Sequence, residues 1–115
     1  MKVGYLITGR LKSTRLPKKL LLKVKGKPIL NHMIDRLKLA KNVDEIIICT
    51  SDNEQDKPLG ILAKENNISC YFGDPDDVLV RLLGAAEKFN LDYILNITAE
   101  PIPHTIIFLL FSASN

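Results

Sequence analysis

The chain has 115 residues, of which 46% are hydrophobic and 25% are charged, and a formal net charge of +3 at pH 7. This length predicts one domain, residues 1–115, with a single core, and the composition is that of a soluble globular protein. No apolar run approaches the ~20 residues of a membrane helix, and the apolar stretch after Met1 is too short for a signal peptide. We therefore expect a cytoplasmic protein with no membrane contact.

The charge is unevenly distributed along the chain. The first 34 residues contain nine Lys or Arg and no Asp or Glu, whereas the remainder carries all 13 acids against seven bases. Nucleic-acid-binding proteins usually spread basic residues along a face, with aromatic side chains between them. Here only Tyr5 lies near the basic cluster. The layout favours one site for a small polyanion and argues against a nucleic-acid partner.

Apolar runs and apolar residues at helical spacing alternate along the chain, which predicts alternating strands and helices. In chain order, we expect a strand over Lys2–Thr8, a helix over Pro28–Ala40, a strand over Glu45–Thr50, a short helix near Pro58–Asn66, a strand over Ile68–Phe72, a helix with an apolar stripe from Val78 to Phe89 and a strand over Asp92–Thr98. A last helix is expected to begin within His104–Ser112.

The helix after Phe72 has an apolar stripe at clear helical spacing. Asp74 or Asp76 is expected to cap its N-terminus. Its stripe is expected to consist of Val78, Leu79, Leu82, Leu83, Ala86 and Phe89.

Two cysteines, Cys49 and Cys70, fall in expected buried strands. Neither has a CxxC partner or a nearby cluster of ligand-type residues. Buried reduced thiols are therefore expected, and not a disulfide or a metal site.

The alternation predicts an α/β fold: an open, mainly parallel sheet with helices on both faces. Right-handed crossovers favour the strand order 3-2-1-4, numbering the four expected strands along the chain. The first and fourth strands then flank the switch point, where such sheets bind ligands at their carboxyl ends. The stretch after the first strand and "TAE" (Thr98–Glu100) after the fourth would lie beside the same crevice.

The stretch after the first strand reads "GRLKSTRLPKK" and contains five cations and no acid. Gly9 permits a tight turn at the end of the strand. Arg10 and Arg15 can each present a bidentate guanidinium to phosphate oxygens, Lys19 adds a point charge, and Ser13 adds a hydroxyl. The stretch suits a nucleoside triphosphate.

Two common nucleotide-binding motifs are absent. The sequence contains neither GxxxxGK[ST], which excludes a P-loop NTPase, nor GxGxxG, which argues against a dinucleotide fold. The alternative for the basic stretch is a solvated loop without a ligand, and charge alone does not separate the two interpretations.

Four motifs in this order resemble sugar cytidylyltransferases of the acylneuraminate and 3-deoxy-manno-octulosonate type. They read "GRLKSTRLPKKLL", "GKPILNHMIDRL", "DEIIICTSD" and "YFGDPDDVLVR", and they cover about the first hundred residues. The sequence is most similar to the variety of spore-coat polysaccharide biosynthesis. The "STRLPxK" core is also similar to that of 3-deoxy-manno-octulosonate cytidylyltransferases.

The resemblance implies a Rossmann-like nucleotidyltransferase that joins CTP to a sugar acid, giving a CMP-sugar and pyrophosphate with Mg²⁺ as cofactor. It implies that Arg10 and Lys19 are catalytic, because they would stabilise charge on the leaving pyrophosphate. The implied nucleotide-binding residues are Gly9, Arg10, Ser13, Arg15, Lys19, Asp52, Asp77 and Arg81. Gly26, Lys27 and Pro28 would shape the turn into the first helix.

Several of these residues have a purely structural alternative. Asp52 and Asp76 would then be helix caps, and Arg81 would pair with Asp77 one helical turn away. Lys27 would face solvent. A packed or surface role is also expected for His32, and the side chains of Phe72 and Phe89 are expected in the core.

The fourth strand departs from the family pattern. The family has a metal-binding Asp there, followed closely by Pro, whereas this chain has Glu100 in "NITAEPIP". Glu100 is the nearest carboxylate and the expected Mg²⁺ ligand, although its extra methylene moves the oxygens in a near-octahedral site. Alternatively, a residue has been lost and Glu100 corresponds to the acidic neighbour of that Asp.

The resemblance also implies a family length about twice that of this chain. We therefore expect a truncated fold, and the alternatives are a fragment, a shortened reading frame and a stand-alone half. An open sheet of this kind would expose an edge and apolar surface, which favours a homo-oligomer. The alternative function is a non-catalytic nucleotide-binding module, or a remnant that acts through a partner chain.

Overall fold

The computed structural model describes residues 2–8, 23–98 and 106–110. The larger elements in chain order are β1 (Val3–Thr8), α1 (Ile29–Leu37), β4 (Glu45–Ser51), α2 (Pro58–Glu65), β5 (Ser69–Gly73), α3 (Val78–Lys88), β6 (Tyr93–Thr98) and β7 (Ile106–Leu110). The short ones are β2 (Lys23–Val24), β3 (Lys27–Pro28) and the 3₁₀ helix η2 (Glu54–Asp56). No helix within these described ranges is long and apolar enough to cross a membrane.

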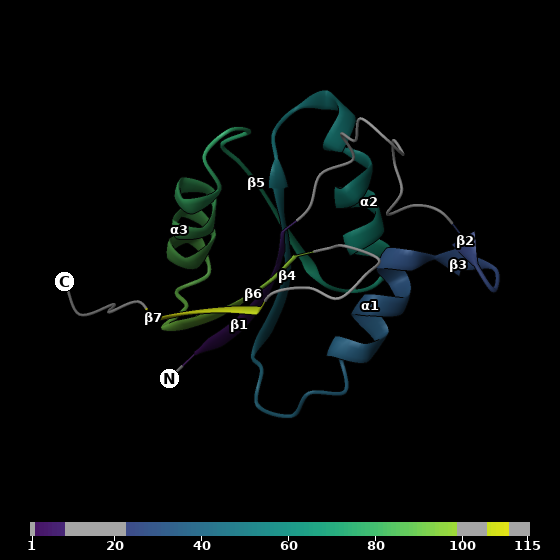
Figure 1. Cartoon of the computed structure of the whole chain (residues 1–115), viewed down its shortest axis with the longest axis horizontal. Coiled ribbons are helices and arrows are strands. Elements are labelled where there is room, and N and C mark those ends of the chain that lie inside the picture. Colours follow the sequence, from purple (N-terminus) through teal and green to yellow (C-terminus); the bar gives the residue numbers. More distant parts are fainter. Residues whose placement is uncertain (1, 9–22, 99–105, 111–115) are drawn as a thin grey trace.

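The main sheet has the order β5-β4-β1-β6-β7. The first four strands of this order are parallel, and they are the four strands expected from the sequence. The predicted order 3-2-1-4 is therefore confirmed. Helices α1 and α2 cover one face of the sheet and α3 covers the other (Figure 1), which confirms the predicted layers.

A second, two-stranded sheet precedes α1. β2 and β3 pair antiparallel through a turn at Lys25 and Gly26, whose φ angles are 54° and 86°. Two consecutive positive φ angles are typical of the tight hairpin turn that glycine favours. Pro28 then stands directly before the first residue of α1, so this segment does form the turn into the first helix.

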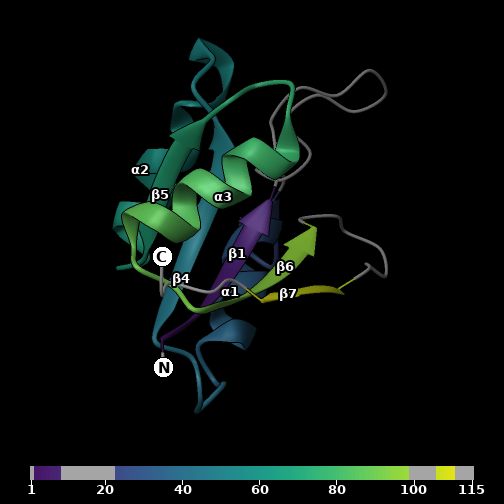
Figure 2. The same cartoon turned by 90° about the vertical axis from the view of Figure 1, so that its left-hand side faces the viewer.

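The expected last helix is wrong. Ile106–Leu110 instead forms β7, which pairs antiparallel with β6 at the edge of the sheet (Figure 2). A short apolar run suits a buried helix and a strand equally well. The open edge of β6 decides between them, because pairing there satisfies backbone groups that a helix at this place would leave exposed.

The core consists of two apolar clusters, one on each face of the sheet. Alternate residues of β1 point to opposite faces, so Ile7 packs with α1 and α2 whereas Leu6 packs with α3. Both side chains are fully buried. The continuous apolar run of β1 is therefore explained by its central position, covered on both sides.

The packing of α3 differs from the expected stripe. Leu82, Ala85 and Ala86 are buried, but Leu79 is 56% exposed and Leu83 is 41% exposed. The helix instead turns Arg81, which lies between Leu79 and Leu83 in the sequence, inward, so that this charged side chain is buried. When apolar residues occupy adjacent faces of a helix, the sequence does not determine which face is buried, and packing against the sheet decides it.

Candidate functional site

The carboxyl ends of β1, β4, β5 and β6 meet at one edge of the sheet. The next strand of this sheet along the chain, β4, lies beside β1 on one side, and β6 lies beside β1 on the other. The switch point therefore lies between β1 and β6. Here Thr8 Oγ1 donates a hydrogen bond to Asn96 Oδ1 at 2.9 Å. Both residues are buried. A satisfied polar pair thus joins the two strands at the place where such sheets bind ligands.

A second buried polar pair lies at the carboxyl end of β4. The hydroxyl of Ser51 donates to a carboxylate oxygen of Asp56 in η2, and both side chains have no exposed surface. Ser51 Oγ also accepts the backbone N–H of Asn53 at 3.2 Å. Burial of a carboxylate is costly unless it is hydrogen-bonded. Sequence reasoning missed this pair, because "SDNEQD" is typical of a solvated turn and carries no signal of burial.

Asp52 follows Ser51 directly and is exposed. Its backbone N–H donates to the carbonyl of Gly73 at 3.0 Å, which ties the end of β4 to the end of β5. The N-cap residue of η2 is Asn53, so Asp52 is not the cap of that helix. Within the described residues, no hydrogen bond or ion pair engages the carboxylate of Asp52. This carboxylate is therefore available to a ligand.

The loop between β5 and α3 is built on two aspartates. Asp74 Oδ1 accepts the backbone N–H groups of Asp76 and Asp77, both at 2.8 Å. The N–H of Asp77 first, and then that of Asp76, lowers the pKa of Asp74. Asp77 caps α3 by accepting the backbone N–H of Val80 at 3.1 Å. The expectation that Asp74 or Asp76 caps this helix is wrong, since Asp74 organises the preceding turn.

Arg81 is the charged residue that α3 turns inward, and it is only 3% exposed. Its Nη1 donates to the backbone carbonyl of Asp74 at 3.1 Å, so the pairing with Asp77 that the sequence left open is not formed. Its Nε is buried and has no hydrogen-bond partner among the described residues. A Cβ at Gly73 would lie 2.6 Å from Tyr71 Cε2 and 3.0 Å from Arg81 Cγ, so any side chain at this end of β5 would crowd both residues.

A family model described as cytidylyltransferase matches residues 5–113. This chain belongs to the cytidylyltransferase family. It is 36% identical over 100 residues to a 3-deoxy-manno-octulosonate cytidylyltransferase of Geobacter sulfurreducens, covering 87% of this chain and 39% of the relative. It is 33% identical over 100 residues to an uncharacterized protein of Methanocaldococcus jannaschii, covering 87% of this chain and 41% of the relative.

Solved structures agree with the cytidylyltransferase assignment. A cytidylyltransferase from Leptospira borgpetersenii superposes with a TM-score of 0.80 at 38% identity, covering 85% of this chain and 41% of that chain. CMP:2-keto-3-deoxy-manno-octonic acid synthetase complexed with CTP superposes with a TM-score of 0.73 at 25% identity, covering 90% and 42%. This cytidylyltransferase chain thus spans about two fifths of the length of the relatives it matches.

The remaining predicted site residues of the cytidylyltransferase chain lie outside the described ranges. They are Gly9, Arg10, Ser13, Arg15, Lys19 and Glu100. Among the residues that are described, Asp52, Asp77 and Arg81 are brought to the same edge of the sheet by β4, β5 and α3. In the described ranges, no group of three or more His, Cys, Asp or Glu side chains could hold a metal ion.

Other residues with open interpretations have structural roles. Lys27 forms an ion pair with Asp35 of α1, and the ring of His32 bonds to the carbonyl of Val24 at 2.7 Å. The expectation that Phe72 lies in the core is wrong, because this residue is 37% exposed.

Both cysteines of this chain are free thiols, as expected, but only Cys49 is buried as expected, whereas Cys70 is partly exposed. Cys49 packs with the α3 cluster and Cys70 with the α1 and α2 cluster, on opposite faces of the sheet. Burial raises the pKa of Cys49 to about 12 and that of Cys70 to about 11. Neither thiol is poised as a nucleophile.

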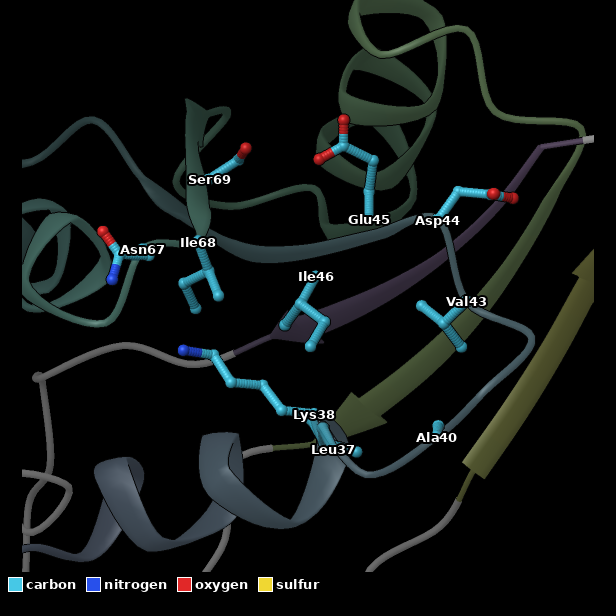
Figure 3. Close-up of a pocket in the computed structure, with 10 residues that line it drawn as sticks. All are labelled: Leu37, Lys38, Ala40, Val43, Asp44, Glu45, Ile46, Asn67, Ile68 and Ser69. Carbon is cyan, nitrogen blue, oxygen red and sulfur yellow. The ribbon is translucent and has the colours of Figure 1, made fainter.

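A cavity of about 270 Å³ lies at the opposite edge of the sheet, at the amino ends of β4 and β5 (Figure 3). Its charged lining groups are already engaged within the fold. Lys38 donates to the carbonyl of Asn66, Asp44 accepts the N–H of Val3 at 2.8 Å, and Glu45 pairs with Lys2. This cavity is separate from the carboxyl edge, and each of its charged lining groups already has a hydrogen-bond or ion-pair partner within the fold.

Proposed function

We propose that this chain binds CTP at the carboxyl edge of its sheet, as the nucleotide-binding part of a cytoplasmic enzyme that transfers CMP to a sugar acid in polysaccharide biosynthesis. One observation carries the proposal: the order β5-β4-β1-β6 puts the switch point beside the strand that the basic stretch Gly9–Lys19 follows. Ligands of open α/β sheets bind at this point. Relatives are named 3-deoxy-manno-octulosonate cytidylyltransferases, which supports a 3-deoxy sugar acid as acceptor.

In the proposed reaction, a hydroxyl oxygen of the sugar acid bonds to the α-phosphorus of CTP. The bond from that phosphorus to the bridging oxygen breaks, pyrophosphate leaves with the electron pair, and the hydroxyl proton passes to solvent. Arg10, Ser13, Arg15 and Lys19 would hold the triphosphate. Arg10 and Lys19 would also stabilise the charge that develops on pyrophosphate, which is the main protein contribution in such transfers.

Among the described residues, Asp52 would contact the nucleoside side of CTP. Its exposed carboxylate has no partner within the described ranges and is suited to accept from a hydroxyl or amino group. Arg81 is buried, and its Nη1 donates to the carbonyl of Asp74, so it would act on the nucleotide by holding the loop after β5. The carboxylate of Asp77 caps α3, so this residue would act by holding the loop at the end of β5 in place.

We assign Mg²⁺ as the cofactor and Glu100, two residues after the end of β6, as its protein ligand. Mg²⁺ at a nucleotide is usually held by one or two carboxylates together with phosphate oxygens. One carboxylate together with phosphate oxygens would therefore be enough to hold the ion, and a cluster of three is not required. When bound, the ion would neutralise charge on the phosphate oxygens.

Calorimetry with CTP and Mg²⁺ tests the binding step. Replacement of Arg15 by alanine should weaken CTP binding by about 1.5–3 kcal/mol, the range for hydrogen bonds to charged groups. Equal affinity of the wild type and Arg15→Ala would remove the basic stretch from the site.

Release of pyrophosphate from CTP with a panel of 3-deoxy sugar acids tests turnover. Release that Glu100→Gln abolishes would support the metal assignment. Because the chain spans about two fifths of its relatives' length, binding and turnover are separate proposals. Binding of CTP without release would favour the non-catalytic nucleotide-binding module.

A further inference from the structure

Asp56 is the one carboxylate among the described residues that is fully buried. It lies at the end of η2, five residues after Ser51, whose hydroxyl donates to it. Ser51 stands inside the motif "DEIIICTSD" and Asp56 lies beyond it, but neither is among the residues that the resemblance relates to the nucleotide. A charged group is rarely fully buried unless it is paired or hydrogen-bonded.

The hydrogen bonds around Asp56 enclose the turn that carries Asp52. Ser51 Oγ accepts the N–H of Asn53 at 3.2 Å while its own proton is donated to Asp56. The N–H of Asp56 in turn donates to the carbonyl of Asn53 at 3.0 Å. Ser51 is therefore the bridge between the buried carboxylate and the backbone one residue after Asp52.

A further bond holds Asp52 from the other side. Its N–H donates to the carbonyl of Gly73 at 3.0 Å, so its backbone is tied to β5 while its side chain stays exposed. A carboxylate on a backbone fixed in this way loses less conformational entropy when it binds a ligand. Such support of a contacting group by buried neighbours is typical of built binding sites.

We propose that Ser51 and Asp56 are positioning residues, which hold the turn so that Asp52 accepts from a hydroxyl or amino group of the nucleoside of CTP. This inference rests on the proposed CTP binding. Ser51 and Asp56 have no exposed surface, so they would act on the nucleotide through Asp52 and not by direct contact. The competing explanation is that the pair merely stabilises the turn, with no effect on the ligand.

A double-mutant cycle in CTP affinity separates these explanations. Ser51→Ala and Asp52→Asn should each raise the Kd for CTP about tenfold, and the double variant should bind no more weakly than Asp52→Asn alone. Non-additivity of this kind is expected when one residue acts through its neighbour. Ile34→Val, a core change in α1 on the other side of the sheet from α3, is the matched control and should leave the Kd unchanged.

Each outcome of the cycle decides a different point. If the wild type fails to bind CTP, the proposed function fails and this inference with it. If the wild type binds CTP but the effects of Ser51→Ala and Asp52→Asn multiply, or either variant binds like the wild type, the inference alone is overturned. Should Ser51→Ala not fold, Ser51→Cys takes its place, because a thiol is nearly the same size and only a weak donor.

Discussion

The Thr8–Asn96 hydrogen bond at the switch point gives a quantitative test of the fold. Thr8→Val keeps the shape of the side chain but removes the donor, which leaves the buried Asn96 carbonyl without this partner. An unsatisfied buried group costs about 1–3 kcal/mol. With a denaturant slope of about 2 kcal/mol per M, the midpoint of urea unfolding should fall by roughly 0.5–1.5 M.

Removal of both partners should be milder than removal of one. In Thr8→Val combined with Asn96→Val, neither position keeps a buried polar group without its partner, and valine suits a strand. The double variant should therefore unfold at a higher urea concentration than Thr8→Val. Ile7→Val, on the opposite face of β1, is the control and should lose about 0.5–1.5 kcal/mol whether or not Asn96 is changed. Additive losses for Thr8 and Asn96 would refute the assigned hydrogen bond.

Three further predictions concern pH, thiol reactivity and association. The backbone N–H of Asp77, and then that of Asp76, lowers the pKa of Asp74 in the folded state. The stabilising contribution of the Asp74 carboxylate is therefore present above the unfolded pKa and lost as pH falls through the folded pKa. Over that acid range, the urea midpoint should decline less in Asp74→Asn than in the wild type. Burial raises the pKa of Cys49 to about 12, and partial burial raises that of Cys70 to about 11. A thiol reagent at pH 8 should therefore label both far faster in urea than in the native protein, and equal rates would show that the fold does not protect these thiols. The exposed apolar residues of α3 should promote homo-oligomers. On dilution, light scattering should show that Leu83→Glu dissociates at a higher protein concentration than the wild type does. A wild type that is monomeric at every concentration would exclude association.

Much of the fold follows from local patterns in the sequence. Buried parallel strands need continuous apolar runs, and the crossovers between them are right-handed, so the order of β5, β4, β1 and β6 could be derived without a structure. The same argument locates the switch point. The positive charge of the stretch after β1 then indicates an anionic ligand. Only the resemblance of the motifs to those of cytidylyltransferases points to CTP as this ligand.

The tertiary structure decided which residues are buried and which segments pair. The apolar run of β7 became a strand because β6 offered an open edge, and α3 turned Arg81 inward, where it donates to the carbonyl of Asp74. Asp56 lies in a stretch that reads as solvated, yet the end of β4 encloses it and Ser51 donates to it. Propensity and periodicity describe one segment at a time, whereas burial and hydrogen bonding depend on neighbours that are distant in the sequence and adjacent only in the folded chain.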